Sequence, residues 1–421
     1  MPQHRRVGFS PPWNLGRLLG GLKPTLLLVA CHAAMADDTA SGELRLRWDA
    51  RDANAAGIAP ASPSSASLEA ELRGTWHAPI KSLSASANVL LGGEHPEGGP
   101  TRSLTRANEL YGSADFGSWQ ASVGKKIVGW DVGYGFRPND FVQQEERRTL
   151  LTVTPEGRPL LQLEHFGADD AASLLWVNPQ RTRDDDDAQR GARESALAAR
   201  WYRRSGALDG YLFGRWGQHT QASLGAALAW VAGDELELHA SARVLQRHDG
   251  WTMRSGPLLS SANPWQQSTL GGTAQWLLGA NWTGQQQQSL LVEFWHDGTT
   301  LADADWDAWR ARNRALVTLA GPPPQAIAGN LAWQATPFAS TSLRRDNLFV
   351  RAAWQPEHWL LSLDALITPA DRGHAITAAV QWQGDRLKLN VALRVYGGPA
   401  DALMSQLPQR RVGVIAASWA F

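Results

Sequence analysis

The sequence predicts an all-β chain: a transmembrane, antiparallel, up-and-down β-barrel of about 18 strands, with long extracellular loops, one of which carries a helix. Apolar and polar residues alternate along most of the chain with the two-residue period of a strand. Short and long connections also alternate, as they do between strands that cross a bacterial outer membrane. Finally, Trp is abundant, with 21 residues against 5 Tyr and 10 Phe, and the indole ring favours a membrane–water interface.

The last segment of the chain shows the alternation clearly and ends on an aromatic residue. Counting back in twos from Phe421 gives Trp419, Ala417, Ile415 and Gly413, which are all apolar or small. About ten residues are enough for a tilted strand to cross a bilayer, although the last strand of a soluble β-sandwich would also fit this segment alone. The segment resembles the closing strand of Gram-negative outer-membrane β-barrels. The resemblance implies that Trp419 and Phe421 form the signal read by the outer-membrane barrel assembly machinery.

The N-terminal residues 1–36 have the features of a signal peptide. Basic residues precede a short apolar run, and Ala34-Met-Ala36 is a small-x-small cleavage site. The run is too short to cross a membrane as a helix. Cleavage after Ala36 leaves residues 37–421 without cysteine, which suits export through an oxidising periplasm. The alternative is lipidation of Cys31, which ends a lipobox-like sequence.

Composition excludes two classes of protein. The formal net charge is zero and only 19% of residues are charged, so the chain lacks the basic surface that binds nucleic acid. A mean hydropathy of -0.31 without a second long apolar run argues against a bundle of membrane helices. No change in composition divides residues 37–421, so we expect one barrel domain whose outer wall contacts outer-membrane lipids.

The predicted strands follow from their alternating faces. In the first strand, residues 43–49, Leu44, Leu46 and Trp48 share one face and charged residues occupy the other, as expected between lipid and a water-filled lumen. The segment 386–396 has the same two faces. The remaining predicted strands are residues 67–77, 82–91, 106–116, 119–130, 159–166, 171–177, 194–204, 208–217, 220–231, 235–247, 269–282, 289–296, 345–354, 358–368, 374–383 and 409–421.

The lengths of the connections provide an independent check on these strands. With the N-terminus in the periplasm, seven short turns all fall on the periplasmic side: Ala78, Gly117, Ser205-Gly206, Ala232-Gly233, Gly284, Gln355-Pro356 and Gly384. This assignment requires Thr149–Val153, which could pass for a strand, to belong to a loop; counting it would reverse the side of every later connection. Without it the number of strands is even. The long outer connections are then residues 50–66, 92–104, 131–157, 180–193, 249–267, 298–342 and 398–408.

The lumen of such a barrel is too wide for side chains to fill, so it must hold water, a plug or infolded loops. Its predicted face carries both signs of charge with a small excess of cations, which favours the passage of anionic or polar neutral solutes. The alternative is that these charges pair across strands and only solvate the wall. The lumen-wall residues that we select are Arg45, Arg47, Glu69, Glu71, Arg73, Arg243, Arg351, Lys388 and Arg394.

The outer connection 131–157 is the most specific stretch of the chain, because glycines that permit sharp turns alternate with aromatic and charged residues. The preceding residues 123–130 resemble the Gly-Arg-Gln-x-x-x-Trp-Gly signature of outer-membrane porin-like and polysaccharide-export barrels. Here Lys125-Lys126 replaces Arg-Gln and Asp131 replaces the second Gly. The resemblance implies a loop folded into a pore that passes solutes or exports a polymer; a surface loop ordered by its own contacts is the alternative. The expected constriction residues are Lys126, Tyr134, Phe136, Arg137, Asp140, Glu145, Glu146, Arg147 and Arg148.

The long connection 298–342 contains a predicted helix over residues 302–319. Asp303 can cap it, acidic residues occupy its first turn, arginines follow, and a Gly-Pro-Pro-Pro sequence beginning at Gly321 ends it. Such a helix can cover the pore or pack on the rim of the barrel.

No motif in the sequence predicts a metal site, a cofactor or catalysis. The acidic run Asp184–Asp187 lacks the spaced ligands and the Gly of a calcium loop and is expected to be solvated. Histidines are scattered, and no Gly-x-Ser-x-Gly sequence is present. We therefore expect a non-enzymatic outer-membrane channel for the passage or export of polar or anionic solutes. A structural or adhesion barrel, whose outer loops bind a partner, is the alternative, and an outer-membrane hydrolase is a lesser one.

Overall fold

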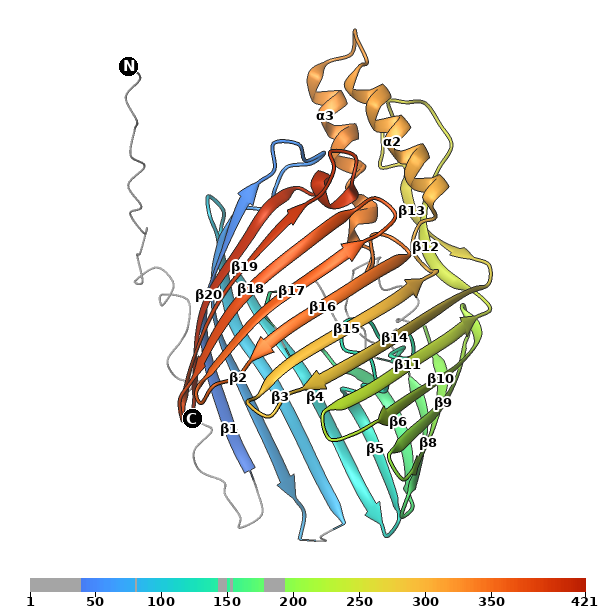
Figure 1. The fold of residues 1–421 in the computed structure, drawn as a ribbon, viewed down its shortest axis with the longest axis vertical. Helices are drawn as coiled ribbons and strands as arrows, with labels where there is room; N and C mark the ends of the chain where they lie inside the picture. Colours follow the sequence, from blue (N-terminus) through green and yellow to red (C-terminus); the bar gives the residue numbers. More distant parts are fainter. Residues whose placement is uncertain (1–38, 80–81, 143–149, 152–153, 178–193) are drawn as a thin grey trace.

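The computed structural model describes residues 39–79, 82–142, 150–151, 154–177 and 194–421. The predicted signal peptide (residues 1–36, with Cys31), the acidic run at 184–187 and the predicted constriction residues Glu145 to Arg148 lie outside the described residues. Eighteen antiparallel strands form a single sheet, which closes on itself because β1 pairs with β20 (Figure 1). The predicted fold class is therefore confirmed, and the number of strands agrees with the prediction.

The strands of the barrel follow one another around the wall in sequence order, apart from β12 and β13, which form a separate hairpin. Their bounds are β1 (Thr39–Ala53), β2 (Ser65–His77), β3 (Leu83–Pro96), β4 (Arg102–Phe116), β5 (Trp119–Lys126), β6 (Arg158–Phe166), β7 (Asp170–Val177), β8 (Ala196–Ser205), β9 (Leu208–Gly217), β10 (Gln221–Val231), β11 (Leu236–Leu245), β12 (His248–Met253), β13 (Trp265–Leu270), β14 (Thr273–Thr283), β15 (Gln288–Asp297), β16 (Asp346–Trp354), β17 (Trp359–Thr368), β18 (Gly373–Gln383), β19 (Leu387–Gly397) and β20 (Gln409–Ala420).

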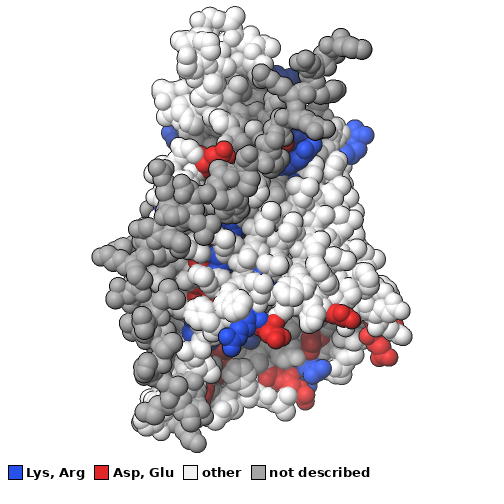
Figure 2. Space-filling model, turned by 90° about the vertical axis from the view of Figure 1, so that its left-hand side faces the viewer, with Lys and Arg blue, Asp and Glu red and all other residues white. Residues whose placement is uncertain are grey.

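The alternation of residues explains why these segments form a closed sheet. In β19, Leu389 and Leu393 are exposed on the outer surface, whereas Lys388 and Arg394 face the interior. Closing the sheet separates an apolar exterior from a polar interior. Closure also pairs the backbone N–H and C=O groups of the two edge strands. On the face drawn in Figure 2, charged side chains gather toward the two ends of the barrel and the described surface between them is mostly uncharged.

The two ends of the barrel differ. Short turns, such as the one between β8 and β9, lie at one end, which we call the short-turn end. The other end, the long-loop end, carries the helices α2 (Asp303–Val317) and α3 (Pro324–Trp333), which project beyond the strands (Figure 1). The 3-10 turns η5 (Thr336–Ala339) and η6 (Leu403–Gln406) belong to the same end. None of the helices in the described part of the chain is long and apolar enough to cross a membrane.

The structure corrects several local expectations. The strand expected over residues 119–130 ends at Lys126, and the connection expected over 249–267 contains most of the β12–β13 hairpin. The predicted helix forms as α2, but its N-cap is Ala302 rather than Asp303; the Asp305 carboxylate accepts a bond from the Ala302 backbone N–H at 2.9 Å. Helix α3 was not predicted. Its first residue is a proline, which a helix tolerates there because that N–H has no intrahelical partner.

Candidate functional site

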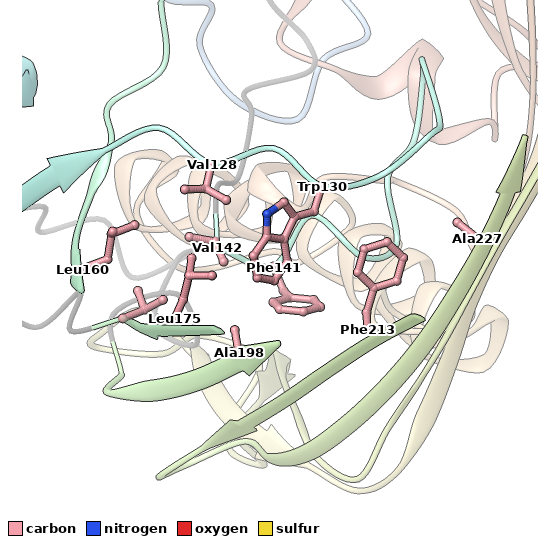
Figure 3. Close-up of a cluster of buried hydrophobic side chains, with 10 residues drawn as sticks. Val128, Trp130, Phe141, Val142, Leu160, Leu175, Ala198, Phe213 and Ala227 are labelled. Atoms are coloured by element: carbon pink, nitrogen blue, oxygen red, sulfur yellow. The ribbon is translucent and has the colours of Figure 1, made fainter. Parts of the chain in front are cut away.

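The chain enters the lumen directly after β5. Residues 127–142, here called the infolded segment, run along the inner wall and bury Val128, Trp130 and Phe141 (Figure 3). The ring of Trp130 lies edge-on to Phe141, with centroids 5.8 Å apart, and stacks at 6.5 Å on Phe213 of β9. Inward-facing apolar residues of β6 to β10 complete this cluster, so five neighbouring strands supply a hydrophobic surface for the segment. The wall residues are Leu160, Leu175, Val177, Ala198, Phe213 and Ala227.

A polar anchor fixes the middle of the infolded segment to β11. The Asp131 carboxylate accepts bonds from the Asn139 backbone N–H at 2.6 Å and from the Ser241 hydroxyl at 2.9 Å. The Asn139 side chain donates to the same Ser241 oxygen at 2.9 Å and to the Ala242 carbonyl at 3.2 Å. Gly225 of β10 is needed for this approach, since a Cβ there would lie 1.8 Å from the Asn139 amide oxygen. The absence of a side chain at Gly225 thus lets the segment pack closely against β10 and β11.

A second polar anchor holds the turn at Tyr134 and Gly135. The carboxylate of Glu293, on β15, accepts the backbone N–H of Tyr134 at 2.7 Å and that of Gly135 at 2.6 Å. His239 Nε2 lies 2.9 Å from the same carboxylate, and both side chains are fully buried. Gly135 cannot be replaced without movement, because a Cβ would come within 2.8 Å of a Glu293 oxygen. A buried carboxylate with three charge-assisted contacts makes this a strong attachment point.

The rest of the anchor is aromatic and cationic. Phe136 stacks on Trp295 of β15 with centroids 5.6 Å apart and planes 14° apart. Arg243 is partly buried beneath the segment, donates to the Pro138 carbonyl at 3.3 Å and places its guanidinium 4.8 Å from the centroid of Phe141. Together these contacts fill the side of the lumen bounded by β6–β11, β14 and β15, which we call the filled half.

The remaining side of the lumen, bounded mainly by β1–β4 and β16–β20, is the open half. It contains a cavity of about 1340 Å³. Its lining includes nine cationic and six acidic side chains, so cations are in excess. The cations are Arg45, Arg47, Arg51, Arg102, Arg106, Arg158, Arg351, Lys388 and Arg394, and the acids are Glu43, Asp49, Glu69, Glu94, Glu156 and Asp364.

Most of the acids in this lining are paired. Arg45 lies 3.0 Å from Glu43 and 3.3 Å from Glu69. Arg47 and Asp49 are 2.6 Å apart, Arg351 and Asp364 are 3.2 Å apart, and Glu156 pairs with Lys125. These pairs agree with the alternative that some lumen charges only solvate the wall.

Four cations of the lining form no ion pair within the described part of the chain: Arg51, Arg102, Arg106 and Lys388. Neutral groups orient two of them. Arg51 donates to the Pro63 carbonyl at 2.8 Å, and Arg106 donates to Asn108 at 2.7 Å and to the Thr154 carbonyl at 3.1 Å. No described acidic side chain therefore neutralises the charge of these four residues.

The residues expected at a constriction separate into two groups. Tyr134 and Phe136 line the cavity; Tyr134 is 50% exposed, whereas Phe136 is buried. Arg137 and Asp140 are placed 3.8 Å from one another and support the fold of the segment itself, and Lys126 lies 3.8 Å from Glu164 on β6. Leu150 and Leu151, which were excluded from the strands, are bends that also line the cavity.

The residues expected on the lumen wall separate in the same way. Arg45, Arg47, Glu69, Arg351, Lys388 and Arg394 line the cavity. Glu71 is buried beside it and accepts bonds from Asn88 at 2.8 Å and Arg73 at 2.8 Å. Arg243 lies in the filled half. Sequence reasoning missed Glu293 and His239, because their partners in the infolded segment are distant in the chain and an inward-facing acid carries no distinctive local pattern.

At the long-loop end, residues that the sequence did not place there line the cavity. Leu343, Met404 and Leu407 reach its lining from the outer connections. A buried aromatic cluster of Trp306, Trp309 and Phe338 joins α2 to η5 above them. Asp371, in the turn between β17 and β18, ties these parts together. Its carboxylate accepts the Leu403 backbone N–H at 3.1 Å and lies 3.9 Å from Arg310 and 4.0 Å from Arg344.

One histidine at the rim has partners that resemble catalytic residues. His219 Nε2 lies 3.0 Å from Asp249 and 2.5 Å from the Thr269 hydroxyl. In a nucleophilic triad the acid and the hydroxyl bind opposite ring nitrogens, whereas here both contact the same nitrogen. The arrangement joins the β9–β10 turn to the β12–β13 hairpin and differs from the geometry of a triad. No group of three or more His, Cys, Asp or Glu side chains suited to a metal ion occurs among the described residues.

Glu194 stabilises the same rim. It accepts bonds from Arg215 at 2.7 Å and from the Thr220 backbone N–H at 3.0 Å, and it is also bonded by the His219 backbone N–H and the Thr220 hydroxyl. Burial raises the pKa of this carboxyl, but the Arg215 charge and the hydrogen bonds outweigh burial and hold the pKa below its usual range.

Comparison with known proteins supports the fold. No protein-family model matches the chain, and no curated protein matches it by sequence. The structure is similar to that of Acinetobacter baumannii OccAB1, with a TM-score of 0.58 and 11% identity over 92% of this chain and 97% of that one. It is also similar to Pseudomonas aeruginosa OccK5 (OpdH), with a TM-score of 0.55 and 11% identity over 91% and 98% of the two chains. At this identity the likeness concerns the fold alone, and it extends over nearly the whole barrel.

Proposed function

We propose that this protein is an outer-membrane channel that passes polar solutes and prefers anions. The observation that carries the proposal is the combination of an apolar outer wall with a cavity lined by charged side chains along one side of a closed barrel. A channel needs both: the wall must match lipid, and the lumen must offer water and polar contacts throughout.

The distribution of Trp supports the membrane location. Exposed Trp side chains form one group near the short-turn end, for example Trp119, Trp282 and Trp359, and a second group at the opposite ends of their strands, for example Trp176 and Trp216. Two aromatic belts at the heights of the two membrane–water interfaces are typical of transmembrane barrels. On this proposal the short-turn end faces the periplasm and the long-loop end faces outward. Residues 1–36 would direct export.

The same proposal includes assembly by the outer-membrane barrel machinery. Trp419 and Phe421 are about half exposed at the short-turn end, where such machinery could reach them. Phe421 also exchanges backbone hydrogen bonds with Gly42, at 2.8 and 2.9 Å. Removal of Phe421 should reduce the amount of heat-modifiable barrel in outer-membrane fractions, whereas Phe421→Trp should not. Equal yields from the deletion and the wild type would contradict this part.

The preference for anions rests on the unpaired cations of the open half. A unit charge about 4 Å from a passing ion contributes roughly 1 kcal/mol in bulk water and about 4 kcal/mol at the effective dielectric constant near a protein surface. Arg51, Arg102, Arg106 and Lys388 therefore dominate over the paired charges, whose fields largely cancel. The proposal covers both the passage of small polar or anionic solutes and the export of a polymer.

Planar-bilayer recording tests the proposal. Purified protein should give discrete single-channel conductance, and a KCl gradient should give a reversal potential of the sign for anion preference. Replacing all four unpaired cations by Gln should lower the anion-to-cation permeability ratio by roughly three-fold or more. The matched control replaces four exposed arginines outside the cavity, Arg203, Arg254, Arg314 and Arg411, and should retain the ratio. Absence of conductance would favour the structural or adhesion barrel instead.

A further inference from the structure

The upper part of the open half, toward the long-loop end, has two unlike walls. One wall is apolar and aromatic. Phe349 of β16, Leu366 of β17 and Tyr396 of β19 are only partly buried and line the cavity, and Leu343 and Met404 continue this surface from the outer connections. Phe349 faces the lumen from the same strand as the charged Arg351. This apolar wall therefore differs from the charged lining found elsewhere.

The facing wall is cationic. Arg102 and Arg106 lie on β4 and Arg51 lies near the long-loop end of β1. The strands β1–β3 and β17–β20 separate β4 from β16 on one side, so Arg106 and Phe349 stand on nearly opposite sides of the barrel. Glu94 is the register partner of Arg102, but the two form no ion pair among the described residues.

The apolar wall is held in place before any solute arrives. Phe349 packs against the stacked pair Phe136 and Trp295, and a Cβ on Gly135 would lie 3.2 Å from the Phe349 ring. Leu366 packs against both this cluster and the cluster beneath the outer connections. Because the surface is already fixed, a ligand that lies on it loses little free energy to ordering side chains.

We propose that this upper cavity binds an organic anion carrying a planar apolar group, with the ring on Phe349, Leu366 and Tyr396 and the anionic group toward Arg51, Arg102 and Arg106. The inference rests on the proposed channel function and names its solute class. A small anion without a ring uses only the cationic wall, and a neutral ring uses only the apolar wall. A molecule with both groups uses both walls and binds more tightly than either.

Equilibrium binding provides the first test. Naphthalene-2-sulfonate is titrated into refolded protein in detergent, with its fluorescence as the readout. Its affinity should exceed by roughly ten-fold that of 2-naphthalenemethanol, which lacks the charge, and should be reduced by roughly ten-fold in Phe349→Ala. Replacing Arg51, Arg102 and Arg106 together by Gln should reduce it similarly. Leu348→Ala, a change of similar size next to Phe349 on the outer face of the same strand, should have no effect.

The second test is the block of channel current. Naphthalene-2-sulfonate added at the long-loop side should reduce KCl current at concentrations at which methanesulfonate has no effect, and Phe349→Ala should abolish this difference. If Phe349→Ala fails to give a heat-modifiable barrel, Phe349→Leu, which keeps the volume but removes the planar ring, replaces it.

The two tests separate the two proposals. Binding that depends on Phe349 and the arginines, in a protein without conductance, would retain the site and overturn the channel function. Conductance with anion preference, but with equal affinity for naphthalene-2-sulfonate in wild type and Phe349→Ala, would overturn the site and retain the channel.

Discussion

The filled half and the open half of the lumen are built from strands with the same alternating pattern, yet they use their inward-facing polar residues differently. In the filled half, the buried Glu293 and the partly buried Arg243 form hydrogen bonds with the infolded segment. In the open half, Arg45 and Arg47 pair with neighbouring acids and border the cavity. The role of a lumen residue is therefore decided by what lies against it, and its position in the strand decides only that it faces inward.

The largest expected effect on conductance comes from deleting part of the infolded segment. Deleting residues 133–147 removes the turn held by Glu293 and the stacked Phe136, so the filled half should open. Conductance should rise roughly two-fold or more, because the interior of a barrel of this size is too wide for its wall side chains to fill. Single-channel recording measures this. Shortening the exposed α2–α3 turn by residues 319–322 is the control, and unchanged conductance in the 133–147 deletion would contradict the division into two halves.

The next effect distinguishes an anchor from a lining residue within the same turn. Phe136→Ala leaves a void against Trp295 and should lower the free energy of unfolding by about 3 kcal/mol, as for other buried Phe→Ala changes. Tyr134→Ala, at a half-exposed ring, should change stability little but increase conductance. Urea unfolding in detergent, followed by gel migration without heating, compares the two. Equal losses of stability would show that both side chains serve as anchors.

A somewhat smaller effect is expected from Glu293→Gln. The amide can accept only through its oxygen, so one of the two backbone N–H groups or His239 loses its partner while it stays buried, at a cost of about 2 kcal/mol. The infolded segment should then detach transiently, which appears as current fluctuations. Glu94→Gln, at an acid of the open half, serves as the comparison and should leave the open current steady. Steady current in both variants would refute the anchoring role of Glu293.

The smallest effect concerns pH at the rim. Because the folded-state pKa of Glu194 lies below its usual value near 4.5, the carboxylate stabilises the fold above that pH. The contribution is lost as pH falls from 4.5 through the lower folded-state pKa. The wild type should lose stability in this interval by more than Glu194→Gln does. Parallel pH profiles of thermal unfolding for the two proteins would contradict the assignment.

Much of the fold could be predicted because a barrel strand is a local pattern. The alternation in residues 386–396 needs no knowledge of the rest of the chain, and the structure places β19 there. Helix α3 was missed because the prolines before it indicate the end of one helix and equally permit the start of another. The β12–β13 hairpin is short and lies within a long connection, so its alternation was too brief to recognise.

The site was less predictable because its contacts join distant parts of the chain. The aromatic and charged residues of 131–157 indicated a structured loop, and Tyr134 and Phe136 do border the cavity. The anchors, however, pair Tyr134 with Glu293 and Asp131 with Ser241, and neither partner differs locally from other inward-facing residues. The assignment of a constriction to these residues stays a prediction until conductance is measured.

The seam between β1 and β20 has a consequence for the order of assembly. Because Phe421 exchanges backbone hydrogen bonds with Gly42, the seam cannot close fully until the segment around Phe421 has reached β1. The polar anchors of the infolded segment, Glu293 and Ser241, lie on β15 and β11, away from that seam. The infolded segment can therefore pack on these strands before the seam forms. The cavity beside it is enclosed only when β1 and β20 pair.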